Sequence, residues 1–159
     1  MLETADYIKS SSKARIRLGV AVYPRRGTEV LLQERSGTEL YDGYWDAAAG
    51  GGLEVGSDPK QTAIDEAFQE LGIKIRKRDL IFINTTWVTT ERGENLLVFS
   101  FEVHWWEGTP TIMEPDKCSK LVWFDASALP DSMIPARKEA LLSYYAHGIL
   151  YTESDERIT

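Results

Sequence analysis

The chain has 159 residues, of which 43% are hydrophobic and 27% charged, and its formal net charge is −7. This length and composition predict a single globular domain over residues 1–159. The acidic balance argues against a nucleic-acid polymer as the main partner but is compatible with a small nucleotide. No apolar run is long enough to span a membrane, and no signal peptide opens the chain. Cys118 is the single cysteine, so we expect no internal disulfide and a reducing, cytoplasmic location.

The first third of the chain predicts a hairpin followed by a loop. Residues 1–13 are polar and are expected to form a flexible lead-in. Arg15–Tyr23 is apolar and β-branched, which predicts a strand; Pro24–Gly27 is a turn signal, and Glu29–Arg35 completes the hairpin. Ser36–Tyr44, rich in Gly, Asp and Tyr, is expected to be a loop.

The central stretch Gly50–Ile73 joins a glycine run to an amphipathic helix. Asp58 can cap a helix whose first residue is Pro59, and Gly72 is placed to end it. Its apolar positions recur at helical spacing, which gives the helix a face to bury; they are Ala63, Ala67 and Leu71.

Glu66 and Glu70 lie at positions i and i+4 of this helix, about 40° apart around its axis. Like charges held so close are destabilising unless a cation lies between them. The glycine run lets backbone groups approach a ligand closely. Together these features predict a site for a hard divalent metal that carries a phosphate.

The rest of the chain predicts more strands and a second helix. Leu80–Val88 and Leu96–Trp106 are expected strands, Leu121–Phe124 a short strand, and Pro135–His147 a helix that ends at Gly148. Strands with two separated helices indicate a mixed sheet between helices, an α/β (α+β) fold.

The central stretch resembles the Nudix box, G-x5-E-x7-R-E-U-x-E-E-x-G-U, where U is aliphatic. With its first glycine at Gly51, the helix glutamates fall on Glu66 and Glu70, and the closing residues on Gly72 and Ile73. The resemblance covers roughly residues 17–151. YDGYWDAAAGGGLE is similar to the segment that leads into the box in many family members. LVWFDASALPDSMIPARKEAL resembles the tail of a bacterial branch related to nucleoside triphosphate pyrophosphatases. The resemblance implies the Nudix α/β/α sandwich with a mixed sheet.

Three box positions depart from the pattern. Ser57 replaces the loop glutamate, Asp65 the arginine, and Gln69 the first glutamate of the helix pair. The resemblance implies that the glutamates hold Mg²⁺ or Mn²⁺, so the loss of one carboxylate weakens the metal site, and Asp65 adds negative charge to it.

The resemblance also implies the other metal ligands, with Glu66 and Glu70 as the catalytic residues. Gly50 would contribute its backbone carbonyl, and Glu114, in a proline-flanked loop, a further carboxylate. The alternatives are a solvated helix face for the two glutamates and an exposed loop charge for Glu114.

Arg35, Tyr44 and Trp87 are the candidate substrate-binding residues. An arginine at the end of a strand can hold a phosphate through two hydrogen bonds, although a surface salt bridge is equally compatible. Tyr44 and Trp87 are the candidate platforms for a base, the alternative for each being a packing role.

The leading interpretation is a metal-dependent hydrolase of a nucleoside diphosphate linked to another group. A nucleoside triphosphate pyrophosphatase that releases a nucleoside monophosphate is the first choice. The alternative is a Nudix-fold nucleotide-binding or regulatory module with weak or no catalysis. An isopentenyl diphosphate isomerase ranks last, because it needs a reactive cysteine near the substrate loop and Cys118 lies far along the chain. The oligomeric state stays open, with a homodimer as one alternative.

Overall fold

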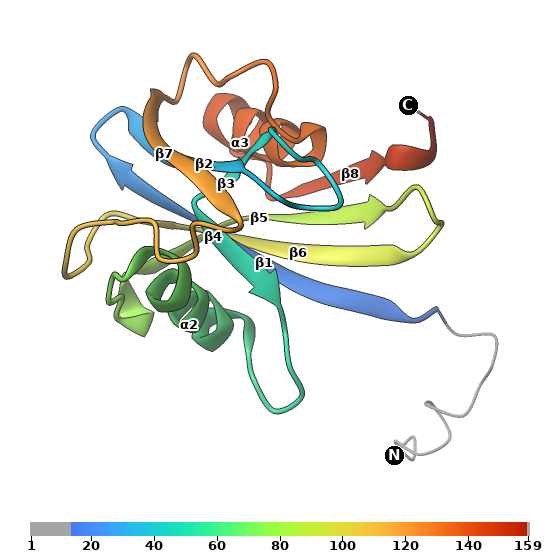
Figure 1. The fold of residues 1–159 in the computed structure, drawn as a ribbon. Helices are drawn as coiled ribbons and strands as arrows, with labels where there is room; N and C mark the ends of the chain where they lie inside the picture. The colour runs from blue at the N-terminus through green and yellow to red at the C-terminus, as the bar shows by residue number, and fades with distance from the viewer. Residues whose placement is uncertain (1–13, 159) are drawn as a thin grey trace.

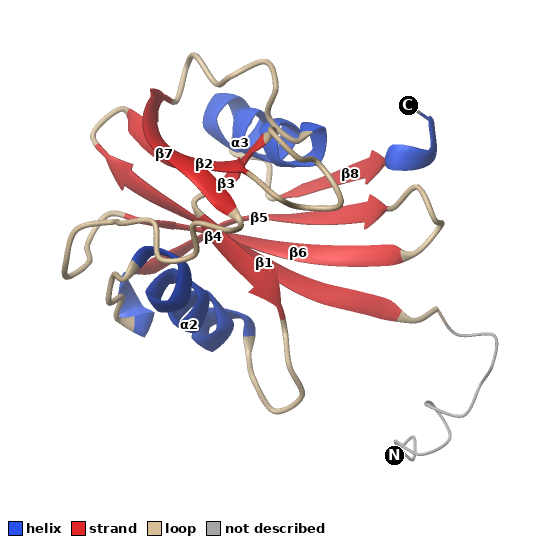
Figure 2. Ribbon diagram, viewed as in Figure 1, coloured by secondary structure: helices blue, strands red, loops and turns tan. Residues whose placement is uncertain are grey.

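The computed structural model describes residues 14–158, so the predicted lead-in at 1–13 lies outside the described residues. Within that range eight strands form one mixed sheet, and helices α2 and α3 cover its two faces (Figures 1 and 2). The predicted α/β/α arrangement with a mixed sheet is therefore confirmed. No helix among the described residues is long and apolar enough to cross a membrane. The elements are β1 (Ile16–Arg26), β2 (Glu29–Arg35), β3 (Trp45–Ala47), β4 (Ala49–Gly52), α2 (Pro59–Leu71), β5 (Leu80–Thr89), β6 (Asn95–Val103), β7 (Cys118–Asp125), α3 (Pro135–His147) and β8 (Tyr151–Asp155), with 3₁₀ turns at Lys77–Asp79 and Glu156–Ile158.

Strand β1 organises the sheet because three strands pair with it. Residues 16–24 run parallel to β6, and residues 19–22 run antiparallel to β4. Its last two residues start the hairpin with β2, which in turn pairs with β3 and β7. The glycine strand β4 is thereby fixed at the middle of the molecule, facing α2 (Figure 1).

Helix α2 begins and ends where its sequence predicts. The Asp58 carboxylate accepts a hydrogen bond from the Gln61 amide at 2.8 Å, and Pro59 occupies the first turn. Gly72 ends the helix in the left-handed conformation, with φ of 69°, which glycine adopts without strain. The buried side of the helix packs into one core cluster with β1 and β4; its helical members are Ala63, Ala67 and Leu71.

Helix α3 covers the opposite face of the sheet. Leu141 packs into a second core cluster with Ala21 and Tyr23 of β1, whose neighbours Val20 and Val22 belong to the first cluster. Successive side chains of a strand point to opposite faces. Buried strands that are apolar on both sides therefore hold the two helices apart across the sheet.

Three predicted strand boundaries were wrong, and one strand was not predicted. Strand β1 continues through Pro24 to Arg26, because Pro24 falls where the strand passes from pairing with β6 to pairing with β2. Strand β6 stops at Val103 instead of continuing through the two tryptophans that follow. Strand β7 is longer than expected because it pairs along all of β2. Strand β8 was not predicted, because its five residues are mostly polar and only one of them is buried.

Candidate active site

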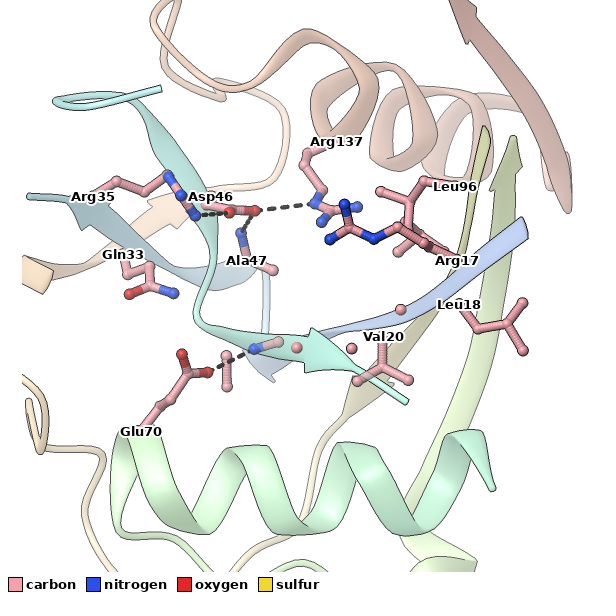
Figure 3. A pocket seen from close by; sticks show the side chains of 16 residues that line it. Arg17, Leu18, Val20, Gln33, Arg35, Asp46, Ala47, Glu70, Leu96 and Arg137 are labelled. Atoms are coloured by element: carbon pink, nitrogen blue, oxygen red, sulfur yellow. Dashed lines mark hydrogen bonds and ion pairs between the residues drawn. The ribbon is translucent and has the colours of Figure 1, made fainter. Parts of the chain in front are cut away.

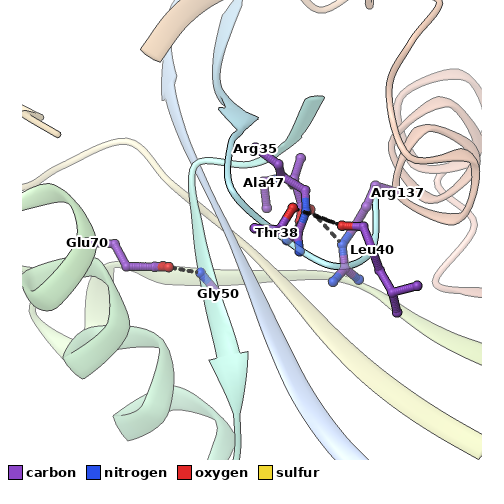
Figure 4. A network of polar contacts seen from close by, with 8 residues as sticks. Arg35, Thr38, Leu40, Ala47, Gly50, Glu70 and Arg137 are labelled. Carbon is purple, nitrogen blue, oxygen red and sulfur yellow. Dashed lines mark hydrogen bonds and ion pairs between the residues drawn. The ribbon is translucent and has the colours of Figure 1, made fainter. Parts of the chain in front are cut away.

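The carboxylates of α2 lie directly against the backbone of β4. The Gly50 amide donates a hydrogen bond to Glu70 Oε2 at 2.7 Å (Figure 4). A Cβ added at Gly51 would lie only 2.5 Å from Glu66 Oε1, so glycine is what allows this approach. A side chain is excluded at Gly50 as well, because a Cβ there would lie 2.5 Å from the Val20 carbonyl oxygen. The glycine run and the two glutamates therefore form one structural unit.

Burial and mutual repulsion raise the pKa values of both glutamates. Burial is the main cause at Glu70, with Glu66 and Glu114 adding repulsion; the pKa of Glu70 rises to about 8 despite the Gly50 hydrogen bond. The pKa of Glu66 also rises, first through burial and then through the charge of Glu114. Lys117, which is 3.3 Å from Glu114, is a cation that opposes this rise at Glu66. The site thus concentrates carboxylates that a bound cation would stabilise as anions.

These donors fit a hard divalent cation. Among residues 14–158, no group of three or more His, Cys, Asp or Glu side chains is placed to hold one ion. Mg²⁺, however, usually keeps several waters and needs only one or two carboxylates together with substrate phosphates. Glu66 and Glu70 supply two. Because the N–H and C=O of one strand residue point to the same side, the Gly50 carbonyl also faces away from β1, toward Glu70.

The charge of Glu114 acts on Glu66 and Glu70. Among the described residues, however, the three carboxylates do not form a group that could hold one ion. Its loop is tied to α2, since the Met113 amide donates to the Glu70 carbonyl oxygen at 3.2 Å. Its side chain forms an ion pair with Lys117. Its role as a metal ligand therefore stays a prediction.

The three residues that depart from the box all line a hollow of about 420 Å³, which Glu66 also lines. Asp58 caps the helix, and the Ser57 hydroxyl lies 2.9 Å from that of Thr62. Asp65 is exposed and accepts a hydrogen bond from the Gln61 side chain. Gln69 is exposed as well. None of the three disturbs the packing of α2.

A cavity of about 230 Å³ opens on the other side of β4 (Figure 3). Glu70 and the glycine strand form one wall, and a charged cluster forms another. At the centre of the cluster, the buried Asp46 carboxylate accepts hydrogen bonds from Arg35 Nη1 at 3.1 Å and from Arg137 Nε at 3.0 Å. Asp46 also accepts a hydrogen bond from the Ala47 amide at 2.7 Å, which fixes its carboxylate.

The predicted substrate-binding residues are only partly brought together. Arg35 lines this cavity, where its salt bridge to Asp46 is half-buried. Tyr44 lines a neighbouring hollow of about 310 Å³, with its ring edge-on to Tyr41. Trp87 lines neither cavity; it lies on β5 next to Val88, whose side chain points to the opposite face. The substrate-binding roles of all three residues stay predictions.

Cys118 is nearer to the site than its position in the chain suggests. It pairs with Arg35 in the sheet, and the negative charge of Glu70 contributes to raising the pKa of its thiol, after burial. Distance along the sequence was therefore a poor reason to set this residue aside. A thiol with a raised pKa stays protonated at neutral pH and is a poor nucleophile, which argues against the isomerase on better grounds.

The site roles of Asp46 and Arg137 were not predicted from the sequence. A signal existed for each: Asp46 stands alone within an apolar segment, and Arg137 is a cation in the first turn of α3, where the helix dipole favours acids. Each is explained by the other, because their ion pair links β3 to the helix.

The family assignment rests on nearly the whole fold. The sequence model of the NUDIX domain matches residues 14–144, which include the glycine strand, α2 and most of α3. The chain belongs to the Nudix family. A Nudix relative, "Uncharacterized Nudix hydrolase orf19" of Rhodococcus erythropolis, is 39% identical over 56 residues. That match spans 35% of this chain and 30% of the relative.

Solved Nudix-type structures share the fold at low identity. A MutT NUDIX hydrolase from Burkholderia pseudomallei superimposes with a TM-score of 0.73 at 24% identity, covering 80% of this chain and 96% of that one. The E. coli ORF135 protein gives 0.71 at 22% identity, with coverage of 84% and 91%. This Nudix chain therefore shares its overall architecture with these proteins.

Proposed function

We propose that this Nudix protein is a metal-dependent hydrolase of a nucleoside diphosphate linked to another group. A nucleoside triphosphate is the first substrate to test, with a nucleoside monophosphate as the product. Family membership supports hydrolysis as the general activity. The observation that carries the proposal is the contact of β4 with α2, where Glu66 and Glu70 are held against glycine backbone.

The residues of the chain have distinct parts in this proposal. Glu70 Oε2 is occupied by the Gly50 amide, which leaves Oε1 to bind Mg²⁺ or Mn²⁺ beside Glu66. When bound, the metal neutralises the diphosphate and lowers the pKa of the attacking water. Glu66, or an acid from another loop, would take the proton of that water. Arg35 is the proposed phosphate contact, and Tyr44 the proposed base platform.

A nucleotide-binding or regulatory module is the second candidate. The observation in its favour is the replacement of two box acids, by Ser57 and Gln69, with no third carboxylate grouped with Glu66 and Glu70 among residues 14–158. Such a protein would bind nucleotides through the same cavity and turn them over slowly or not at all.

One assay separates the two candidates. Turnover is measured on a panel of nucleoside triphosphates and nucleotide sugars with Mg²⁺, with Mn²⁺ and with a chelator. The hydrolase predicts metal-dependent release of a monophosphate from at least one panel member. Nucleotide binding by calorimetry without turnover on any of them would establish the binding module and reject the hydrolase.

We further propose small nucleotides as ligands in the cytoplasm, in preference to nucleic-acid polymers. The net charge of −7 supports this, because polymer binding depends on a basic surface that neutralises phosphates. Tight, salt-sensitive binding to DNA or RNA that free nucleotides do not compete would overturn it.

A further inference from the structure

We propose that Arg17 and Arg137 form an anion subsite that binds a phosphoryl group of the ligand away from the α2 carboxylates. This deepens the proposed function by naming a charged group that the ligand carries at the far end of the cavity. The two guanidinium groups line one cavity. Their ion pairs with Asp46 and Glu94 leave donors that can bind a phosphoryl group.

Arg137 is built into the wall of the cavity. Its Nε donates to Asp46 Oδ1, and the same buried carboxylate takes Arg35 through its other oxygen. One negative charge therefore holds two positive ones. Within the described residues no hydrogen bond is made by the two Nη groups of Arg137, which line the cavity in Figure 3. A planar guanidinium fixed through Nε presents its remaining donors in a set direction, which suits two-point binding of a phosphoryl group.

Arg17 reaches the same space from β1. It lines the cavity of about 230 Å³ and the adjoining one of about 190 Å³, and Arg137 lines both. Among residues 14–158, Arg17 forms an ion pair with Glu94 at 3.4 Å, between side chains that are 76% and 54% exposed. Exposed pairs of this kind contribute little stability, so the guanidinium is released easily to a ligand.

The charges of the cavity favour an anion at this end. Three arginines line the cavity of about 230 Å³, against two acids, Asp46 and Glu70. The adjoining cavity adds Glu94 and Glu156 to the lining. Figure 3 shows Glu70 on one side of the pocket and the guanidinium groups of Arg17 and Arg137 on the other. Apolar walls from Val20, Leu96 and Val98 lower the local dielectric constant and strengthen the attraction. A ligand whose diphosphate lies at the metal site beside Glu70 would therefore carry its further phosphoryl group at this end.

A purely structural role for these arginines is the competing explanation. Arg137 also ties α3 to β3 through Asp46, so its removal could damage the fold. Arg17 has no such role, because it is exposed and pairs with one exposed glutamate. Arg26 serves as a matched control: it lies on the same strand, is also exposed, and forms an exposed ion pair with Glu29.

The test is calorimetric titration of the full chain with inorganic phosphate in the presence of a metal chelator. We expect Arg17→Gln to weaken phosphate binding about tenfold, about 1.4 kcal/mol, and Arg26→Gln to leave it unchanged. Arg137→Lys keeps the charge and the link to Asp46 but loses the fork, and should weaken binding to a similar degree. No phosphate binding by the wild type, or equal binding by all variants, overturns the subsite.

A second measurement ties the subsite to the ligand and separates it from catalysis. NADPH and NADH differ by one phosphoryl group, and they are compared as competitors of phosphate in the metal-free protein. The subsite predicts tighter competition by NADPH, and loss of this preference in Arg17→Gln. Equal competition in both proteins would assign the site to free phosphate and overturn its role in ligand binding. Because no turnover is measured, an inactive protein would refute the proposed hydrolase and leave this result to stand.

Discussion

The Gly50 amide and Glu70 Oε2 meet at 2.7 Å, joining the glycine strand to the helix that follows it. The hydrogen bond orients one carboxylate oxygen toward the backbone and leaves the other without this contact. A half-buried carboxylate is thus positioned before any ligand arrives. Its raised pKa shows that the protein stabilises its charge incompletely, which is the condition under which a metal binds with most effect.

The first prediction concerns Glu70→Gln, which should abolish metal-dependent hydrolysis and keep the fold. The amide oxygen of glutamine can still accept the Gly50 hydrogen bond, but a neutral side chain is a poor Mg²⁺ ligand. We expect kcat/KM to fall by several orders of magnitude in a phosphate-release assay. Glu139→Gln, an exposed change on α3, is the control. A variant that keeps more than about a tenth of the activity would remove Glu70 from the mechanism.

The second prediction concerns stability against pH in the metal-free protein. The pKa of Glu70 rises from 4.5 to about 8 in the fold, so the folded state binds more protons than the unfolded state between these values. The free energy of unfolding must therefore fall as pH rises through this window, and reach its low level above pH 8. The contribution is absent below pH 4.5, where both states are protonated.

Glu70→Gln removes this titration and tests its size. At pH 9 the variant should be more stable than the wild type by a few kcal/mol, since one pKa unit corresponds to about 1.4 kcal/mol. At pH 4 the two proteins should have the same stability. Urea unfolding at both pH values, with chelator present, measures the difference. A stability gain that is equal at pH 4 and pH 9 would show that Glu70 does not titrate in this window.

The third prediction uses two neighbouring glycines as a matched pair. Gly51→Ala places a methyl group 2.5 Å from Glu66 Oε1 and should displace that carboxylate. At Gly52 the nearest atom to an added Cβ is the Leu18 carbonyl oxygen at 3.8 Å, so Gly52→Ala should be harmless. We expect Mg²⁺ affinity to fall at least tenfold in Gly51→Ala. For Gly52→Ala we expect the free energy of unfolding to change by less than about 1 kcal/mol. Calorimetry with Mg²⁺ compares them; equal affinities would exclude Glu66 as a ligand.

The fourth prediction concerns the box departures on α2. Asp65 and Gln69 are exposed beside Glu66, so Asp65→Arg with Gln69→Glu can be made without repacking the core. The double variant should bind Mg²⁺ more tightly than the wild type and hydrolyse nucleotides faster, and exceed Gln69→Glu alone, because Asp65 contributes to raising the pKa of Glu66. Titration with Mg²⁺ and phosphate release measure both.

A double variant that gains neither affinity nor rate leaves two explanations, which Glu114→Gln distinguishes. If Glu114 already completes the metal site, this change should abolish activity. If the cavity is used only for binding, Glu114→Gln should change nothing, because no metal-dependent step depends on it.

Local signals in the sequence were sufficient for α2 and its glycine strand. Asp58, Pro59 and Gly72 act on the backbone within a few residues of themselves, and the structure places each as its chemistry predicts. The family frame extended this to the sheet and to the position of Glu66 and Glu70. Strand ends were less predictable, because Pro24 and Val103 depend on which strand lies alongside.

The far wall of the cavity could not be predicted in the same way. Asp46 and Arg137 are 91 residues apart and meet because β3 and α3 pack together, a contact that no periodicity records. Cys118 shows the same limit, since its nearness to Arg35 results from the pairing of β7 with β2. Contacts between distant segments decide these positions.

The shared carboxylate of Asp46 has a consequence for how the protein loses activity on heating. Its hydrogen bonds to Arg35, Arg137 and the Ala47 amide connect β2, β3 and α3 at one point. Any motion that lifts α3 from the sheet breaks the ion pair and alters the cavity at the same time. We therefore expect the cavity to lose its shape in the same unfolding step in which α3 leaves the sheet. The exchange rate of the Ala47 amide proton would report on both changes.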